Sequence, residues 1–378
     1  MAKRKLRDLL DTEDLSPIKF KNATVSPKQT KYHPCHHWHE EKCNCPDTTI
    51  RKKEETIVNK EEETLEKAKS SSKGIIWAGE RACKGIKKTC SEYDFAEGYV
   101  PQIDAKYILQ EDEAETIAFA LENDDNLLIT GPPGCGKSSH VLQMLAILNW
   151  EVNRFSCSEE TSNSRIIGQW VIQGSEMVWI DGHVTDAMRN GKVLLEEEAD
   201  FMRPELRGEL HTVMEKGGTL ELHTHHPKTG RLFRETINKH EDFRWVSTAN
   251  TIGLGDDKFL YHGTTMQNAA SRDRYEVILT MDYPAPGVEV DIITTKVPKI
   301  SKEIANRMVE VANAIRIAFK NGTCNFPFTI RRTISWAKYY IRKEPTAGTK
   351  LAILNFASVQ DQLTICGIIE THMALKIH

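Results

Sequence analysis

The chain has 378 residues, of which 39% are hydrophobic and 28% are charged, so it can bury one large core or two moderate ones. Its formal net charge of −4 argues against a general affinity for nucleic acid. No apolar run approaches the ~20 residues of a membrane span. We therefore expect a cytoplasmic, globular protein with no membrane partner, and we expect its nine cysteines to be free or metal-bound.

Residues 1–95 are predicted to form an irregular, polar N-terminal region. The segment 51–73 is almost wholly charged or small and polar, which is typical of a solvated helix or a linker. Two interpretations are open for the cysteines of this region: a tetrahedral Zn²⁺ site, or a polar tail with free thiols, because their spacing fits no standard zinc motif. The candidate zinc ligands are Cys35, Cys43, Cys45, Cys83 and Cys90.

A phosphate-binding loop follows the apolar segment 126–130 and precedes a helical pattern. Glycines in such a loop let backbone N–H groups turn toward phosphate oxygens, while Lys137 neutralises the phosphates and Ser138 offers a hydroxyl to Mg²⁺. A Gly-rich turn can also be simple chain punctuation, but here the spacing is complete. The predicted ATP-binding residues are Gly131, Pro132, Pro133, Gly134, Cys135, Gly136, Lys137, Ser138 and Ser139.

The fold class predicted for 96–284 is α/β, with a parallel sheet between helices. Short β-branched or apolar runs recur between helical patterns, as parallel sheets require. They lie at residues 127–130, 153–157, 193–195, 245–248 and 276–280. Two hairpins are expected as insertions, one around 171–180 and one around 220–233. From 285 to 378 the pattern turns helical and predicts a separate α-helical lid domain.

The segment Val193-Leu194-Leu195-Glu196-Glu197-Glu198 predicts an apolar strand that ends in carboxylates. Glu197 is placed to hold Mg²⁺, and Glu198 to polarise an attacking water. This order resembles a Walker B element, although Glu197 replaces the usual aspartate. The alternative is that the three glutamates begin a solvated helix.

Further polar residues follow the later strands. Asn250 ends the strand at 245–248 and is a candidate to orient the same water. Arg272 and Arg274 precede the last strand and are candidates to reach a neighbouring subunit's γ-phosphate. Arg331 and Arg332 begin a lid helix and are candidates to report nucleotide state. For Arg272 or Arg274 taken alone, a surface ion pair is the default interpretation, and Arg331 and Arg332 are likewise informative only through their order in the chain.

The order of these features resembles that of AAA+ ATPases of the MoxR and CobS group, the latter a subunit of aerobic cobaltochelatase. Across about residues 99–345, the strings Thr248-Ala249-Asn250-Thr251-Ile252-Gly253-Leu254-Gly255-Asp256 and Leu260-Tyr261-His262-Gly263-Thr264 carry the resemblance. The resemblance implies that Arg274 is an arginine finger and that Arg331 is the sensor 2 arginine, with Arg332 as the alternative.

The resemblance also implies a homo-oligomer, with six subunits in a ring, that consumes ATP with Mg²⁺. It implies a partner with a von Willebrand A domain and a chelatase large subunit that inserts Co²⁺ into a corrin ring, as in cobalamin biosynthesis. Bacteriophage-encoded versions of this family exist. Two other functions stay open: a MoxR-like remodelling ATPase acting on another von Willebrand A protein, and a nucleotide-gated scaffold with little turnover.

Overall fold

A computed structural model describes residues 99–253 and 265–377, so the predicted N-terminal region and its candidate zinc ligands lie outside the described residues. The strands are β1 (Leu127–Thr130), β2 (Val152–Ser156), β3 (Gly168–Gln173), β4 (Glu176–Asp181), β5 (Val193–Glu197), β6 (Thr219–His225), β7 (Leu232–Asn238), β8 (Arg244–Ala249) and β9 (Val277–Thr280).

The helices run from α3 to α14, with two short 3₁₀ turns, η1 and η2. Their bounds are α3 (Glu111–Glu122), α4 (Lys137–Ile147), α5 (Asn163–Ile166), α6 (His183–Asn190), η1 (Ala199–Phe201), α7 (Pro204–Glu209), α8 (His211–Met214), α9 (Ala269–Arg272), α10 (Pro286–Lys296), α11 (Lys302–Lys320), α12 (Ile330–Arg342), α13 (Pro345–Ala352), η2 (Leu354–Phe356) and α14 (Val359–Met373). None of these helices is both long and apolar enough to cross a membrane.

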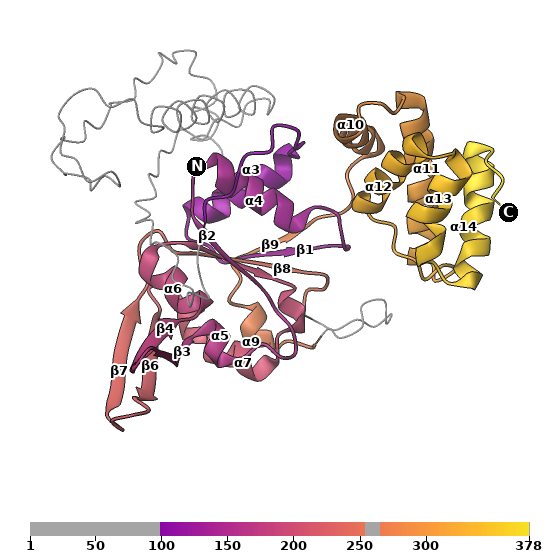
Figure 1. The fold of residues 1–378 in the computed structure, drawn as a ribbon. Coiled ribbons are helices and arrows are strands. Elements are labelled where there is room, and N and C mark those ends of the chain that lie inside the picture. The colour runs from indigo at the N-terminus through magenta and orange to yellow at the C-terminus, as the bar shows by residue number, and fades with distance from the viewer. Residues whose placement is uncertain (1–98, 254–264, 378) are drawn as a thin grey trace, which may run out of the picture. The chain divides into compact units, whose positions relative to one another are not determined.

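Five of the strands form one parallel sheet in the order β2-β5-β8-β1-β9. Each of the five strands expected from the sequence is present within two residues of its predicted bounds. Helices α3 and α4 cover one face of the sheet, and α6 and α7 lie on the other (Figure 1). The α/β fold predicted from the sequence is therefore confirmed.

The order of the strands brings distant segments together at one edge of the sheet. Strand β1 lies between β8 and β9, with Leu127 opposite both Val246 and Val277. The loop after β1 therefore begins beside the end of β8, and the acidic end of β5 lies one strand further along. Ligand sites in open parallel sheets lie at these carboxyl ends.

Both predicted hairpins are present and are longer than the sequence suggested. Strands β3 and β4 pair around a turn at 174–175, and β6 and β7 pair from Thr219↔Asn238 to His225↔Leu232. Trp170, Trp179 and Phe233 pack against one another, with ring centroids between 5.4 and 5.9 Å apart, and so join the two hairpins. The hairpins therefore share one small aromatic core.

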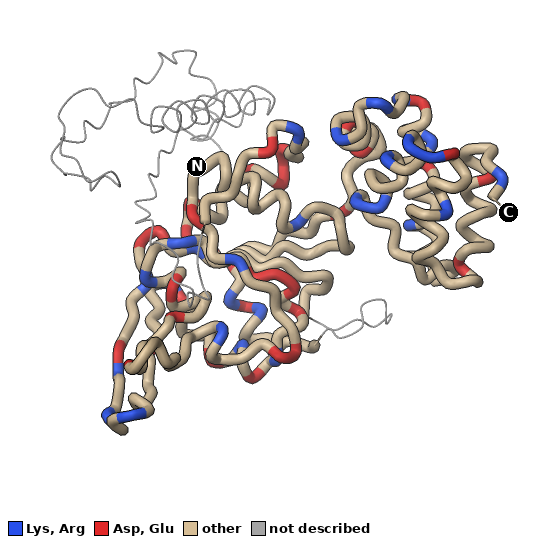
Figure 2. Tube along the Cα trace, viewed as in Figure 1, with Lys and Arg blue, Asp and Glu red and all other residues tan. Residues whose placement is uncertain are grey.

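The region after β9 is helical, as predicted. Helix α11 has one buried face, on which Met308, Val311 and Ile315 are fully buried. Ser301 caps this helix by accepting a hydrogen bond from the Ile304 N–H. The core that these residues form also includes Phe328, which precedes α12, and large side chains of α12 and α14. Charges of both signs are interspersed along the described elements (Figure 2).

Candidate functional site

The loop between β1 and α4 has a backbone that only glycine adopts easily. Gly131, Gly134 and Gly136 have φ angles of 149°, 68° and 114°. A Cβ on Gly131 would lie 2.1 Å from the Met281 carbonyl oxygen, so this position also lacks room for a side chain. The glycines that the sequence singled out are therefore required by the shape of the loop itself.

Lys137, the first residue of α4, is directed back over this loop. Its Nζ donates to the carbonyl oxygens of Gly131 at 2.7 Å and Pro132 at 3.1 Å, and to Oδ1 of Asn250 at 3.1 Å. Burial lowers the pKa of Lys137, while the nearby carboxylates of Asp200 and Glu198 act in the opposite direction. Three candidate residues from separate segments, at positions 137, 198 and 250, thus share one site.

The three consecutive glutamates have three different environments. Glu196 is fully buried on the face of the sheet that α7 covers, where it pairs with Arg207. Glu197, on the opposite face by strand alternation, forms an ion pair with Arg154 of β2. Glu198 follows the strand with a φ of 55° and accepts a hydrogen bond from Ser156 Oγ at 3.2 Å. The glutamates are therefore a strand end and not the start of a solvated helix.

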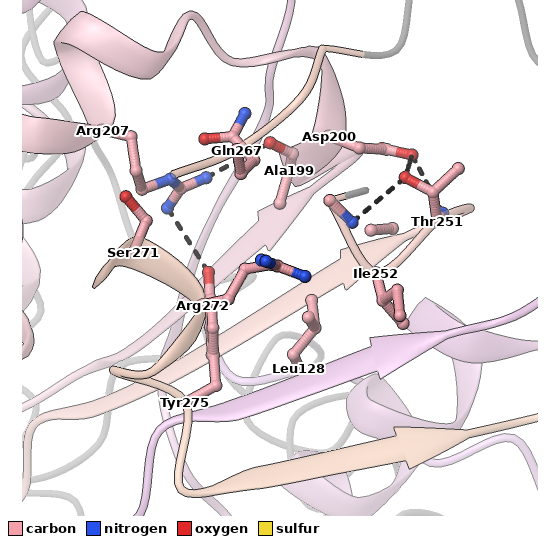
Figure 3. Close-up of a pocket in the computed structure, with 12 residues that line it drawn as sticks. Leu128, Ala199, Asp200, Arg207, Thr251, Ile252, Gln267, Ser271, Arg272 and Tyr275 are labelled. Carbon is pink, nitrogen blue, oxygen red and sulfur yellow. Dashed lines mark hydrogen bonds between the residues drawn. The ribbon is translucent and has the colours of Figure 1, made fainter. Parts of the chain in front are cut away.

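Asp200 positions Asn250, which the sequence alone did not suggest. Its Oδ2 accepts from the backbone N–H of Asn250 at 3.0 Å. It also accepts from the backbone N–H of Thr251 at 3.1 Å and from the Thr251 hydroxyl (Figure 3). Burial raises the pKa of Asp200, although these N–H donors lower it in part. The signal available in the sequence was an aspartate two residues after Glu198. The structure shows that Asp200 is buried, and a buried carboxylate needs hydrogen-bond partners.

The two arginines before β9 differ in where they lie. Arg272 lines a small internal pocket with Leu128, Ala249 and Tyr275, beneath the ends of β1 and β8 (Figure 3). Arg274 lies nearer the surface, where its Nη1 donates to the Ala270 carbonyl oxygen at 2.7 Å and its Nη2 pairs with Glu215 at 3.1 Å. The geometry therefore favours Arg274 over Arg272 as a side chain that can leave its own chain.

The two arginines of α12 also differ. The Arg332 guanidinium lies 3.8 Å above the Phe356 ring and donates to the Ala352 carbonyl oxygen at 3.1 Å, so it packs within the helical region. Arg331 is exposed in the lining of a groove that also contains Thr329 and Asp361. This difference favours Arg331 as the side chain available to a ligand.

These residues fit a magnesium nucleotide. The glycine cradle, the half-buried ammonium of Lys137 and the N-terminus of α4 provide the positive potential and close backbone approach that a triphosphate needs. Ser138 and Glu197 carry oxygen atoms of the kind that Mg²⁺ prefers and would be its ligands. Among residues 99–253 and 265–377, no group of three or more Cys, His, Asp or Glu side chains is arranged to hold a metal ion by itself.

Comparison with known proteins agrees with this geometry. Residues 126–262 match the AAA domain of the dynein-related subfamily. The chain is 31% identical over 254 residues to the aerobic cobaltochelatase subunit CobS of Sinorhizobium sp, covering 65% of this chain and 74% of CobS. It is 29% identical to protein NorQ of Paracoccus denitrificans over 210 residues, 56% of this chain and 72% of NorQ.

A third relative is named for a von Willebrand factor A domain. The chain is 24% identical over 243 residues to the von Willebrand factor A domain-containing protein 8 of Mus musculus. The match covers 61% of this chain and 12% of the mouse protein.

Proposed function

Because this chain belongs to the AAA ATPases of the CobS and MoxR group, we propose that it hydrolyses ATP in a ring of identical subunits and uses the cycle to remodel a partner protein. The single observation that carries this proposal is the contact between Lys137 and Asn250, which joins the phosphate-binding loop to the end of β8. A purely structural loop would not need a half-buried lysine that donates to a strand-end amide.

The residues of the site take separate roles in the proposed reaction. The loop from Gly131 to Ser138, which includes Lys137, binds the triphosphate. Asn250 orients the attacking water. Glu198 accepts a proton from that water, since among the described residues Glu196 and Glu197 form ion pairs with arginines and Glu198 forms none. Bound Mg²⁺, held by Ser138 and Glu197, would offset charge on the phosphate oxygens.

Two arginines complete the proposed site from outside the sheet. Arg274 reaches the γ-phosphate bound by the neighbouring subunit, so the ring is needed for turnover, and an arginine supplied in trans is worth about 10³–10⁵ in rate. Arg331, in the helical domain, contacts the nucleotide that its own subunit binds. We propose six subunits for the ring, as the resemblance implies.

The proposed client is a protein with a von Willebrand A domain, as part of a chelatase that inserts Co²⁺ into a tetrapyrrole. The similarity to CobS supports the chelatase, and the similarity to the mouse protein supports the von Willebrand A partner. The similarity to NorQ favours a second candidate, a MoxR-like chaperone whose client is another von Willebrand A protein.

Affinity capture tests the client. Glu198→Gln protein is loaded with ATP, which should hold the ring in its bound state, and is incubated with lysate from the cells that express it. Glu205→Gln, an exposed glutamate of α7, serves as the matched control. Recovery of a von Willebrand A protein with a chelatase large subunit supports the chelatase, and recovery of the former alone supports the chaperone. Capture of neither class by an ATP-loaded ring would contradict both.

A further inference from the structure

A closed polar network lies between the sheet and α7, on the face opposite to α3 and α4. Its centre is Glu196, which accepts hydrogen bonds from both Nη atoms of Arg207, at 2.8 and 2.6 Å. Glu196 also accepts from Ser247 Oγ at 2.6 Å and from Cys157 Sγ at 3.2 Å. The last member, Tyr275, has its hydroxyl 2.9 Å from Ser247 Oγ. The same hydroxyl lies 3.5 Å from Nη1 of Arg207 (Figure 3).

The donors and acceptors of this network fix the direction of each hydrogen bond. Burial alone would raise the pKa of Glu196, but the Arg207 guanidinium outweighs it and holds that pKa below its usual range. Glu196 is therefore a carboxylate, which only accepts, so Ser247 must give it its single proton. Ser247 Oγ then accepts from Trp245 Nε1 at 3.0 Å and from the hydroxyl of Tyr275. Tyr275 is thereby required to donate.

Each end of the network is adjacent in sequence to a residue of the proposed reaction. Glu196 directly precedes Glu197 and Glu198 in chain order. Ser247 lies three residues before Asn250 on β8, and Tyr275 directly follows Arg274. The bond between Ser247 and Glu196 thus joins β8 to the acidic end of β5. The bond between Ser247 and Tyr275 joins β8 to the turn that carries Arg274.

We propose that Tyr275 is a positioning residue: its hydrogen bond to Ser247 sets the place of Arg274, so that each subunit's own β5 and β8 hold the arginine it offers to its neighbour. The inference rests on the proposed function, because it needs Arg274 to act in trans. Loss of the Tyr275 hydroxyl leaves Ser247 and Glu196 paired with Trp245 and Arg207. The turn at 273–275 then keeps the hydrogen bond from Asn126 Nδ2 to the Arg274 carbonyl oxygen but loses its side-chain tie to β8.

The release should affect turnover and not nucleotide binding. The Arg274 side chain is otherwise held by bonds to the Ala270 and His211 carbonyl oxygens and to Glu215, all outside the sheet, while its backbone carbonyl oxygen accepts from Asn126 Nδ2, just before β1, at 2.8 Å. A misplacement of about 1 Å at a catalytic group can cost on the order of 100-fold in rate. Among the described residues, the phosphate-binding loop and Lys137 make no hydrogen bond to Tyr275, so binding of ATP should be retained.

Mixed rings test this inference with full-length protein. Tyr275→Phe, Arg274→Ala and Glu198→Gln are each assayed alone for phosphate release at varied ATP, and the first two are then each mixed with Glu198→Gln. Tyr340→Phe, which removes a hydroxyl from a partly buried tyrosine of the helical region, is the matched control. Melting temperature is followed for each variant, so that a folding defect is seen separately.

Tyr275→Phe alone should lose about tenfold in kcat with KM for ATP changed less than about twofold, because the defect lies in the trans arginine. In the mixture, some Tyr275→Phe sites face the intact Arg274 of a Glu198→Gln subunit, and phosphate release per Tyr275→Phe subunit should rise several-fold, as it does for Arg274→Ala. Tyr340→Phe should keep the rate of the unaltered protein.

Two results would overturn the inference while leaving the proposed function in place. One is an unchanged kcat for Tyr275→Phe. The other is a rise in the Arg274→Ala mixture without a rise in the Tyr275→Phe mixture, which would place the role of Tyr275 within its own subunit. If the Arg274→Ala mixture also stays inactive while the unaltered protein hydrolyses ATP, the trans role of Arg274 fails and the inference fails with it. If the unaltered protein itself releases no phosphate, the proposed function fails.

Discussion

The ammonium of Lys137 lies 3.1 Å from the side-chain oxygen of Asn250, although 113 positions separate the two residues in the chain. The contact exists because β1 and β8 are neighbours in the sheet, with Thr130 opposite Ala249 at their carboxyl ends. Asp200 holds the backbone of Asn250 in place by accepting a hydrogen bond from its N–H at 3.0 Å. Phosphate loop, acidic strand and polar strand end therefore form one unit.

Asn250→Ala should reduce ATP hydrolysis by about 10–100-fold, because it removes a polar group that orients the water and contacts Lys137. The affinity for ATP should change much less, since the loop carbonyl oxygens still hold Lys137. Phosphate release and binding of a fluorescent ATP analogue measure the two effects. Asn238→Ala, an exposed asparagine at the end of β7, is the control and should leave both unchanged. Equal loss in rate and affinity would contradict the assigned role.

Arg154→Ala should lower the Mg²⁺ concentration needed for half-maximal hydrolysis by about threefold, because the Arg154 guanidinium pairs with Glu197 and competes with the metal for that carboxylate. A Mg²⁺ titration at fixed ATP measures the change. Arg231→Ala removes an exposed arginine at the far hairpin and should not shift the titration. A higher Mg²⁺ requirement in Arg154→Ala would show that Glu197 is not a metal ligand.

The buried pair of Glu196 and Arg207 should be worth more to the folded state than any exposed ion pair of the chain. Removing either partner leaves a buried charge uncompensated, so Glu196→Gln or Arg207→Met should lower the free energy of unfolding by about 3–5 kcal/mol. The double variant Glu196→Leu/Arg207→Met should lose less than the sum of the two single changes.

Denaturant unfolding gives these free energies. The comparison is Arg307→Ala, which breaks the exposed 2.9 Å contact with Glu303 on α11 and should cost less than about 0.5 kcal/mol. Additive losses in the double variant would mean that the buried pair contributes through separate contacts.

His183 should make the folded state sensitive to mild acid. Its Nδ1 lies 2.6 Å from Asn153 Oδ1, and burial, assisted by the charge of Arg165, lowers its pKa from 6.5 to about 4. Between those pH values the unfolded chain binds a proton that the folded chain does not. The stabilising contribution is therefore complete above pH 6.5 and declines by up to about 3 kcal/mol as the pH falls to 4.

Urea unfolding of the unaltered protein and of His183→Gln checks this pH dependence. The difference in unfolding free energy between the two proteins should shrink as the pH falls from 6.5 toward 4. The difference isolates His183 from the other titrating groups. A difference that stays constant over this interval would show that the histidine is already charged in the folded protein.

Sequence patterns were sufficient for the sheet and for the phosphate-binding loop, because strand period and glycine spacing are local signals. The hairpins were predicted too short: in β6 and β7, exposed polar residues such as His223 and Thr236 alternate with buried ones and weaken the apolar pattern. The three glutamates looked equivalent in sequence. Only the fold shows that Arg207, from a later helix, neutralises Glu196, and that Arg154 faces Glu197.

The arginines show the same limit. Sequence order put forward Arg272 beside Arg274 and Arg331 beside Arg332, and no local pattern separates the members of each pair. Tertiary packing does: Arg272 lines an internal pocket, and Arg332 stacks on Phe356. Such contacts depend on which helices pack against each other, and local sequence patterns do not predict that packing.

The proposed function requires Glu198 to drive hydrolysis, while the phosphate-binding loop and Lys137 bind the nucleotide. Phosphate release by the full-length protein and by Glu198→Gln, together with ATP affinity for both, tests it most directly. We predict that Glu198→Gln loses at least about 100-fold in turnover while its affinity for ATP stays within about threefold. Equal and negligible turnover in the two proteins would contradict the account and leave a nucleotide-gated scaffold in its place.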